Sequence, residues 1–260
     1  MILLRSILFN IAFYLYTTVA VFLIIPVFLL PHRIGWWAVR AWAKINLWLL
    51  RTIVGLDFEI RGRENIPQGG LLVASKHQSA WETFALIPLF ENPTYIMKRE
   101  LMWIPFFGWY AKRFGMIPIN RGRGSAVLPD LTAKARKAVA DNRQILIFPE
   151  GTRRPPGAKP AYKFGIAYLY SHLDCPVLPI ALNSGLYWPR RRWVRYPGRV
   201  IVEILPAIEP GIPASDFRER LTDSIEEASD RLLLEACEAT PAPPLSPQAR
   251  QHLDDVFGSN

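Results

Sequence analysis

A histidine and a glutamate lie five residues apart, His77 and Glu82, where a short apolar run gives way to a helical pattern. An imidazole in this setting can serve as the general base that removes a proton from an alcohol, and a nearby carboxylate holds the ring in the required tautomer. Five residues turn an α-helix through about 500°, so the histidine must precede the first regular turn to meet the glutamate. Because an acyl thioester is already activated, such a pair promotes acyl transfer to a hydroxyl without a Ser or Cys nucleophile.

A structural interpretation of the same segment is equally open. Ser79 has the position of a helix N-cap, and Glu82 three residues later completes a capping box. In that interpretation the glutamate only closes the start of the helix, and His77 is a loop residue.

Residues 115–124 end an apolar run in a loop that holds Arg121 and Arg123 among glycines. Such a loop suits phosphate, because its backbone can approach an oxyanion closely and guanidinium groups match phosphate with paired hydrogen bonds. A solvated basic turn is the alternative for this segment taken by itself.

Residues 148–154 also follow an apolar strand, at the carboxyl end where open α/β sheets bind their ligands. We expect Arg153 to be the principal phosphate ligand. Glu150 would position a substrate hydroxyl or brace an arginine, and Gly151 permits close backbone approach. Lys163 is a weaker phosphate candidate.

Short apolar runs alternate with longer helical patterns, which predicts an α/β fold with a mixed sheet flanked by helices. The predicted strands are 58–61, 71–75, 95–98, 115–119, 145–149, 177–183 and 200–205. The predicted helices are 79–90, 103–114, 126–141, 163–172 and 214–239. Pro179 interrupts one strand and predicts an edge or a bulge there. Residues 177–182 would either line an acyl tunnel or form a core strand.

The N-terminal segment is more apolar than the rest of the chain. Residues 7–30 carry no formal charge and, as a helix, reach about 36 Å, which predicts a membrane-embedded helix with a kink or shallow insertion at Pro26. Residues 34–54 combine Trp with basic side chains and predict an interfacial helix, or one packed on the core by its aromatic side. More basic residues follow the first helix than precede it, which places the next domain in the cytoplasm.

Composition excludes some classes of protein. The two cysteines show no paired spacing and no His cluster accompanies them, so we expect neither a disulfide framework nor a metal site. A net charge of +9 favours anionic partners, either nucleic acid or a membrane surface. The basic aromatic stretch 188–196 could stack on bases, but beside a membrane anchor lipid headgroups explain it better, so we expect no nucleic-acid partner.

Taken in order, the segments resemble the glycerolipid acyltransferase family, in particular 1-acyl-sn-glycerol-3-phosphate acyltransferases. The family pattern is His-x-x-x-x-Asp, Gly-x-x-x-x-Arg, Phe-Pro-Glu-Gly-Thr-Arg and a Val-x-Pro strand. Here these correspond to His77–Glu82, a slightly shifted Gly115 with Arg121, a complete match at residues 148–153, and Val177–Pro179. The resemblance spans about residues 58–205.

The resemblance implies a site and a reaction. His77 is then the base and Glu82 its support, while the acceptor's phosphoglycerol contacts these residues: Arg121, Glu150, Gly151, Thr152 and Arg153. The implied reaction forms phosphatidic acid from lysophosphatidic acid. The acyl donor is acyl-CoA or an acyl carrier protein thioester, with no other cofactor, and family members place an N-terminal helical pair in the bilayer.

Three regions follow: a membrane anchor (1–56), a catalytic domain (57–239) and a mobile Pro-rich tail (240–260). We expect the chain at the inner cell membrane, with the catalytic domain on the cytoplasmic side. Two departures from the family pattern stand out, Glu82 in place of Asp and Lys76 in place of the usual Asn. Alternative functions are acyl transfer to a lyso-ornithine lipid, another lysophospholipid or glycerol 3-phosphate, and non-catalytic lipid binding.

Overall fold

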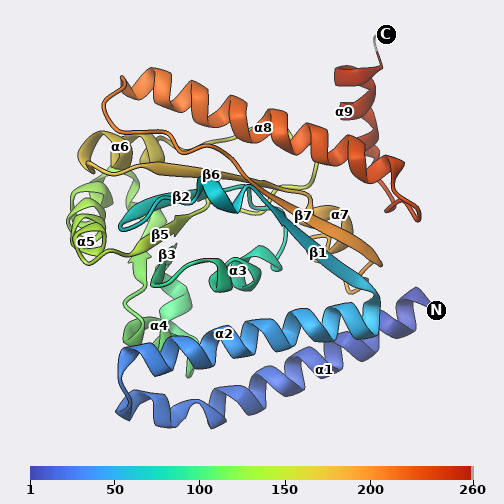
Figure 1. The fold of residues 1–260 in the computed structure, drawn as a ribbon, viewed down its shortest axis with the longest axis horizontal. Helices are drawn as coiled ribbons and strands as arrows, with labels where there is room; N and C mark the ends of the chain where they lie inside the picture. Colours follow the sequence, from blue (N-terminus) through green and yellow to red (C-terminus); the bar gives the residue numbers. More distant parts are fainter. Residues whose placement is uncertain (259–260) are drawn as a thin grey trace.

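A mixed sheet forms the centre of the computed structural model, which describes residues 1–258 (Figure 1). Its strand order is β1-β7-β6-β2-β5-β3-β4, and every neighbouring pair is parallel except β6 with β7. The strands are β1 (Leu56–Arg61), β2 (Leu71–Ser75), β3 (Pro93–Lys98), β4 (Ile117–Ile119), β5 (Gln144–Ile147), β6 (Val177–Leu182) and β7 (Gly198–Ile204). The predicted fold class is confirmed, and each predicted strand is found.

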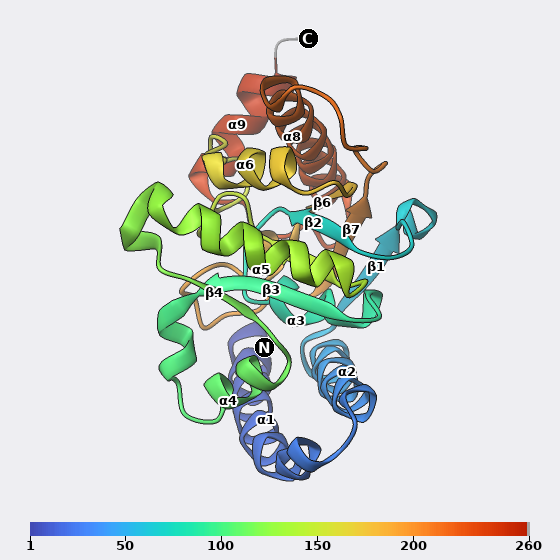
Figure 2. The ribbon, with the colours of Figure 1, turned by 90° about the vertical axis from the view of Figure 1, so that its left-hand side faces the viewer.

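Helices cover both faces of the sheet (Figures 1 and 2). They are α1 (Ile2–Leu23), α2 (His32–Leu49), α3 (Glu82–Ala85), α4 (Phe107–Arg113), α5 (Leu128–Ala140), α6 (Phe164–His172), α7 (Ser184–Tyr187), α8 (Ala214–Glu238) and α9 (Pro247–Phe257). One face carries α5, α6 and α8, and α8 buries Phe217, Leu221 and Ile225 at helical spacing. The opposite face carries α2 and α3, with α1 beside α2.

The strand directions bring the loops of interest together. Strands β2 to β6 all run the same way, so their carboxyl ends meet at one edge of the sheet. The loops that follow β2, β4, β5 and β6 therefore lie at this edge, although they are up to about 100 residues apart in sequence.

The two N-terminal helices lie side by side beneath the sheet (Figure 2). Among residues 1–258, α1 is the one helix long and apolar enough to cross a membrane, and only 22% of its most apolar window is buried. Phe9 packs into the core, while the outer side of α1 stays exposed. Pro26 lies in a 3-10 turn (Ile25–Leu29) after α1 has ended, so it terminates the helix rather than kinking it. These features indicate membrane association.

Pro179 does not mark an edge, because β6 lies between β2 and β7 in the interior of the sheet. The alternative, a bulge, is found on the β7 side. Val177 pairs with Ile208 and Ile180 pairs with Ile204. Residues 205–207, which follow β7, therefore face only residues 178 and 179 of β6. The ring of Pro179, which has no N–H, lies within this irregular stretch, so no regular ladder bond is lost.

The helix predicted over residues 79–90 is much shorter. Only Glu82–Ala85 is α-helical, and Ile87–Leu89 forms a 3-10 turn. Pro88 explains the difference, because it cannot donate a helical hydrogen bond and disfavours an α conformation at Ile87.

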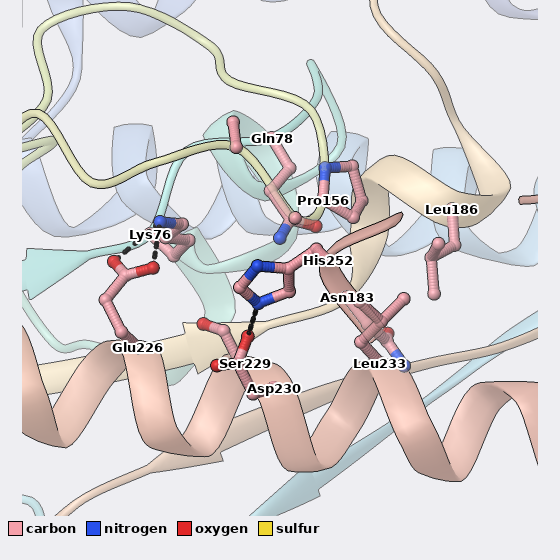
Figure 3. A pocket seen from close by; sticks show the side chains of 12 residues that line it. Lys76, Gln78, Pro156, Asn183, Leu186, Glu226, Ser229, Asp230, Leu233 and His252 are labelled. Carbon is pink, nitrogen blue, oxygen red and sulfur yellow. Dashed lines mark hydrogen bonds and ion pairs between the residues drawn. The ribbon is translucent and has the colours of Figure 1, made fainter. Parts of the chain in front are cut away.

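The predicted mobile tail is partly wrong, since residues 247–257 form α9. The side chain of Ser246 accepts a hydrogen bond from Ala249 N at 3.1 Å, and Pro247 occupies the first turn, where proline is well tolerated. His252 Nε2 lies 2.7 Å from Asp230 Oδ1 of α8 (Figure 3). A cavity of only ≈ 10 Å³ remains beneath α9, about enough for one water. Helix α9 therefore closes this side of the domain.

Candidate active site

His77 and Glu82 meet at the carboxyl end of β2. The distance from His77 Nδ1 to Glu82 Oε1 is 2.9 Å, and the imidazole stacks on Phe148 with ring centroids 3.9 Å apart. His77 lies in the loop between β2 and α3, before the first helical turn, as the spacing requires. Its side chain is 14% exposed, whereas that of Glu82 is fully buried.

The Glu82 carboxylate accepts a complete set of hydrogen bonds. Besides His77, its Oε1 accepts from the backbone N of Gln78 and Ser79 at 2.7 Å each. Its Oε2 accepts from Ser79 Oγ at 2.8 Å and from Ser184 Oγ at 2.7 Å. Burial by itself raises the pKa of Glu82, but the hydrogen bond and charge of His77, with the donors of Ser184 and Ser79, outweigh it and hold the pKa below its ordinary value.

The tautomer of His77 follows from this arrangement. An ionised carboxylate only accepts hydrogen bonds, so Nδ1 of His77 carries the proton that it shares with Glu82. Nε2 then has a free lone pair. The pair is thus built for proton transfer through Nε2.

The hydrogen bonds of the capping interpretation and the His77–Glu82 contact that the base interpretation requires occur in the same residues. Glu82 bonds the backbone N of Ser79, as in a capping box, and Ser79 Oγ accepts from Trp81 N at 2.9 Å. The capping bonds fix the carboxylate in the position from which it holds His77. The two roles are therefore compatible.

Replacement of Ser184 by alanine removes one donor from the buried carboxylate. We expect Ser184→Ala to lower the free energy of unfolding by about 1–3 kcal/mol at pH 7. The folded-state pKa of Glu82 is below its ordinary value of 4.5, so its contribution is complete above that value and is lost as the pH falls through the lowered pKa. Denaturant unfolding at pH 7 measures the change. Ser215→Ala, at an exposed position early in α8, is the control, and an equal loss in both variants would contradict the expectation.

A cavity of ≈ 570 Å³ opens beside His77. Arg121, Arg153 and Arg190 join His77 in its polar lining, and among residues 1–258 no Asp or Glu lines it. The rest of the lining is mostly apolar and comes from α1, α2, α3, α4 and β3: Val21, Ile24, Val39, Trp42, Phe84, Ile96, Tyr110 and Phe114. Such a cavity accepts an anion at its polar part and a hydrocarbon chain in the remainder.

The cavity corrects one prediction about the acyl tunnel. Residues 177–182 do not line it, because β6 lies inside the sheet with every residue buried. Of the two roles left open for this strand, the core strand is the one found. The apolar lining comes instead from the N-terminal helices and α4.

Most of the predicted phosphate ligands gather at the polar part of the cavity. Gly151, Thr152 and Arg153 follow β5 and line it directly. Arg121 reaches across from the loop after β4 and donates to the carbonyl oxygen of Gly151. Gly151 has φ +69°, a backbone conformation that favours glycine. Lys163 is exposed and does not line the cavity, although its stem passes 3.8 Å from where a side chain at residue 151 would begin.

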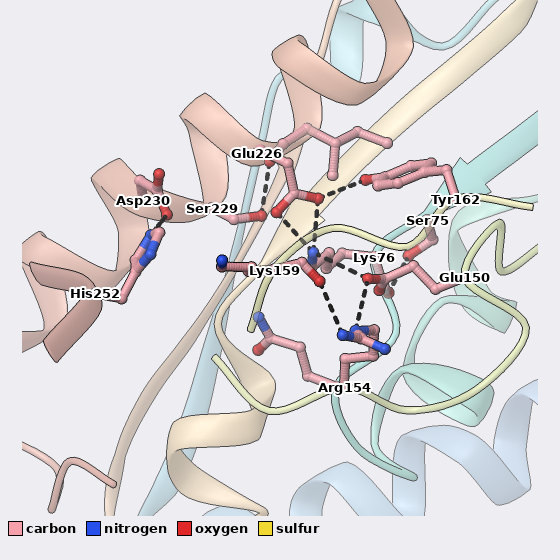
Figure 4. Close-up of polar contacts among 12 residues, drawn as sticks. Ser75, Lys76, Glu150, Arg154, Lys159, Tyr162, Glu226, Ser229, Asp230 and His252 are labelled. Atoms are coloured by element: carbon pink, nitrogen blue, oxygen red, sulfur yellow. Dashed lines mark hydrogen bonds and ion pairs between the residues drawn. The ribbon is translucent and has the colours of Figure 1, made fainter. Parts of the chain in front are cut away.

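Glu150 does not line the cavity, in contrast to its predicted contact with the acceptor, and its carboxylate instead faces Lys76 and Arg154 (Figure 4). Its Oε1 lies 3.5 Å from both Lys76 Nζ and Arg154 Nε, so it braces an arginine, the second role open to it. Burial raises the pKa of Glu150, and Lys76 offsets this only in part. Lys76 Nζ also bonds Glu226 of α8 at 2.6 Å. The lysine beside His77 thus ties the β5 loop to α8.

Two residues of this site lie outside the predicted set. Ser184 is an isolated serine after an apolar strand, and no sequence signal points to it. Arg190 belongs to the basic aromatic stretch 188–196, which the sequence assigns to lipid headgroups. Among residues 1–258 no cluster of three or more His, Cys, Asp or Glu side chains is placed to hold a metal ion.

Comparisons with known proteins agree with this geometry. A model of the Acyltransferase family matches residues 57–183. The 1-acyl-sn-glycerol-3-phosphate acyltransferase of Pseudomonas aeruginosa is 40% identical over 188 residues, 72% of each chain. The corresponding alpha enzyme of Mus musculus is 27% identical over 202 residues, which are 74% of this chain and 71% of the mouse protein.

A solved structure shares the fold. The crystal structure of the 1-acyl-sn-glycerophosphate acyltransferase of Thermotoga maritima superposes with a TM-score of 0.74 at 22% identity. The match covers 89% of this chain and 98% of the Thermotoga chain. The likeness therefore extends over more of the chain than the residues that the family model matches.

Proposed function

The chain belongs to the acyltransferase family that includes 1-acyl-sn-glycerol-3-phosphate acyltransferases, and from this membership we propose that His77 is the base with which it acylates lysophosphatidic acid. The reaction transfers a fatty acyl group from a thioester to the sn-2 hydroxyl and forms phosphatidic acid. One observation carries the proposal. His77 lies where the arginines and the apolar part of a single cavity meet, so a phosphate, a hydroxyl and an acyl chain can be bound around it together.

The proposed chemistry uses the free lone pair of His77 Nε2. This nitrogen removes the proton of the acceptor hydroxyl while the hydroxyl oxygen attacks the thioester carbonyl. Collapse of the tetrahedral intermediate breaks the carbon–sulfur bond, and the thiolate leaves with the proton from the imidazolium. Glu82 stabilises the imidazolium throughout, because its own charge is held in place by four further hydrogen bonds.

The arginines bind the acceptor. Arg153 and Arg121 take the phosphate with paired, charge-assisted hydrogen bonds, and Gly151 and Thr152 let the glycerol approach the backbone. Glu150 acts indirectly by fixing the loop through Lys76 and Arg154. The apolar part of the cavity takes an acyl chain, and the co-substrate is acyl-CoA or an acyl carrier protein thioester with no other cofactor.

The N-terminal helices support a position of this site at the membrane. Exposed aromatic side chains of α2, Trp37 and Trp48, suit the headgroup region, and the outer face of α1 suits the acyl region. Since α1 and α2 also line the cavity, a lysolipid can enter it from the bilayer. We place the enzyme at the inner cell membrane with its catalytic domain in the cytoplasm, because more basic residues follow α1 than precede it.

Arg153→Ala tests the phosphate-bearing acceptor. We expect the KM for lysophosphatidic acid to rise about 10- to 100-fold, since a charge-assisted hydrogen bond to the phosphate is lost. Transfer to monoacylglycerol, which has no phosphate, should hardly change. Initial rates with a labelled thioester measure both. Arg218→Ala, an exposed arginine of α8 on the other face of the sheet, is the control. Equal effects on both acceptors would favour an acceptor without phosphate, such as a lyso-ornithine lipid.

A further inference from the structure

The connection between β6 and β7, residues 183–197, touches three parts of the site. Near its start, Ser184 donates to the Glu82 carboxylate. In its middle, Arg190 Nη1 donates to the carbonyl oxygen of Arg153 at 2.9 Å. Near its end, Arg195 bonds Asn10 of α1 at 3.2 Å. This connection therefore joins the base, the phosphate-binding loop and the membrane helix.

Arg190 has hydrogen-bond donors without a partner in the described chain, and it lines the same cavity as His77. A guanidinium carries five N–H donors, and within the described chain only Nη1 of Arg190 has a hydrogen-bond partner. Its Nε is buried without one. A buried donor without an acceptor is costly, and a bound anion would remove that cost.

The positive charge around Arg190 also favours the binding of an anion. Arg121, Arg153 and Lys98 line the same cavity, and no carboxylate among residues 1–258 does so. Of the acidic side chains nearby, Glu82 holds His77 and Glu150 holds Lys76, while Glu100 lies 3.9 Å from Lys98 and also attracts Arg121. The three guanidinium groups and Lys98 outnumber this one carboxylate, and they repel one another unless a multiply charged anion binds between them.

The packing of the connection fixes Arg190 in advance. Trp188 is buried, with its ring 5.6 Å from that of Phe9 in α1 and 4.2 Å from the guanidinium of Arg195. The backbone of Arg195 is held by Ser6 of α1. Trp188 and Arg195, on either side of residues 190–192, are thus both anchored. The side chain of Arg190 therefore loses little freedom when a ligand binds.

We propose that Arg190 is a third phosphate-binding residue, which binds the phosphate monoester of the acyl acceptor together with Arg121 and Arg153. This inference rests on the proposed function. The acceptor is favoured over the phosphates of the acyl donor because Arg190 is hydrogen-bonded to the residue that binds the acceptor phosphate. Its segment lies outside the four motifs of the family pattern.

The test compares Arg190→Ala, Arg190→Lys and Arg192→Ala. Arg192 is an exposed arginine of the same connection, so its replacement removes the same charge without altering the cavity. Initial rates are measured with lysophosphatidic acid varied at saturating thioester, and then with the thioester varied. We expect Arg190→Ala to raise the acceptor KM about 10- to 100-fold with little change in kcat, and the lysine variant to recover part of the loss. Arg192→Ala should behave as the unaltered enzyme.

Other results would overturn the inference. A rise in the thioester KM alone would move Arg190 to the donor, and unchanged constants for both substrates would remove it from phosphate binding. Thermal unfolding of each variant shows whether the fold is retained, and the lysine variant keeps the test decisive if alanine does not fold. If the unaltered enzyme transfers no acyl group to lysophosphatidic acid, the proposed function itself has failed, which is a separate outcome.

Discussion

Replacement of His77 by alanine is expected to lower kcat for acyl transfer by about 10²- to 10⁴-fold, the contribution typical of a general base. The imidazole is the one group in the cavity lining with a free lone pair beside a fixed carboxylate among residues 1–258. Without it the acceptor hydroxyl must lose its proton to water. The KM for lysophosphatidic acid should change little, because the phosphate ligands that we propose are arginines and not His77. Transfer of a labelled acyl group in membranes measures both constants.

The matched control for His77→Ala is His172→Ala. His172 is exposed at the end of α6, and its Nδ1 bonds only the carbonyl oxygen of Tyr168 in its own helix. It should leave transfer unchanged. Both variants should remain in the membrane fraction and unfold at similar temperatures. Turnover near normal in a folded His77→Ala protein would end the assignment of His77 as the base.

The sequence is sufficient to predict the framework of the site, because the loops that carry the site residues follow buried parallel strands. Strand β2 is entirely buried and contains the continuous apolar run 71–74 followed by Ser75, so its end, and therefore the position of His77, is clear from the residues alone. The same holds for β5 and Arg153. Since parallel strands end at a common edge, identifying the strands also predicts that these side chains meet.

Contacts between distant segments could not be predicted in the same way. Whether Glu150 faces the ligand or the interior depends on Lys76 and Glu226, which lie 74 and 76 residues away from it in sequence. Ser184 reaches Glu82 across 102 residues. The sequence around Glu150 or Ser184 contains no periodic pattern that predicts which residue its side chain contacts. The start of α9 at Pro247 does have a local signal, because a serine precedes the proline. The Pro-rich run before it nevertheless favours a mobile tail over a helix.

The glutamate at position 82 departs from the aspartate of the family pattern, yet its carboxylate reaches the histidine at 2.9 Å. The same carboxylate also accepts hydrogen bonds from the backbone N of Gln78 and Ser79 and from the hydroxyl of Ser184. Together with the hydroxyl of Ser79, these donors hold the carboxylate beside His77. The contact between carboxylate and imidazole is therefore made in this chain with glutamate in place of aspartate.

Replacement of Glu82 by glutamine separates the charge of this carboxylate from its hydrogen bonds. The three N–H donors at Oε1 favour the amide oxygen there, and the amide NH₂ can donate to the hydroxyls of Ser79 and Ser184, so the fold and the tautomer of His77 are kept. Only the charge that we propose to stabilise the imidazolium is lost. We therefore expect kcat to fall about 10²- to 10³-fold.

The lowered pKa of Glu82 keeps the unaltered carboxylate ionised from about pH 6 to 9, so throughout that range the comparison with Glu82→Gln is between a charged and a neutral side chain. Glu82→Asp is the matched variant, since it keeps the charge and has the family's usual residue, and it should retain more activity than the glutamine variant. Rates across this pH range with saturating substrates measure both. If glutamine supported turnover equal to that of aspartate, the charge at position 82 would have no part in catalysis, and the carboxylate would serve the helix start alone.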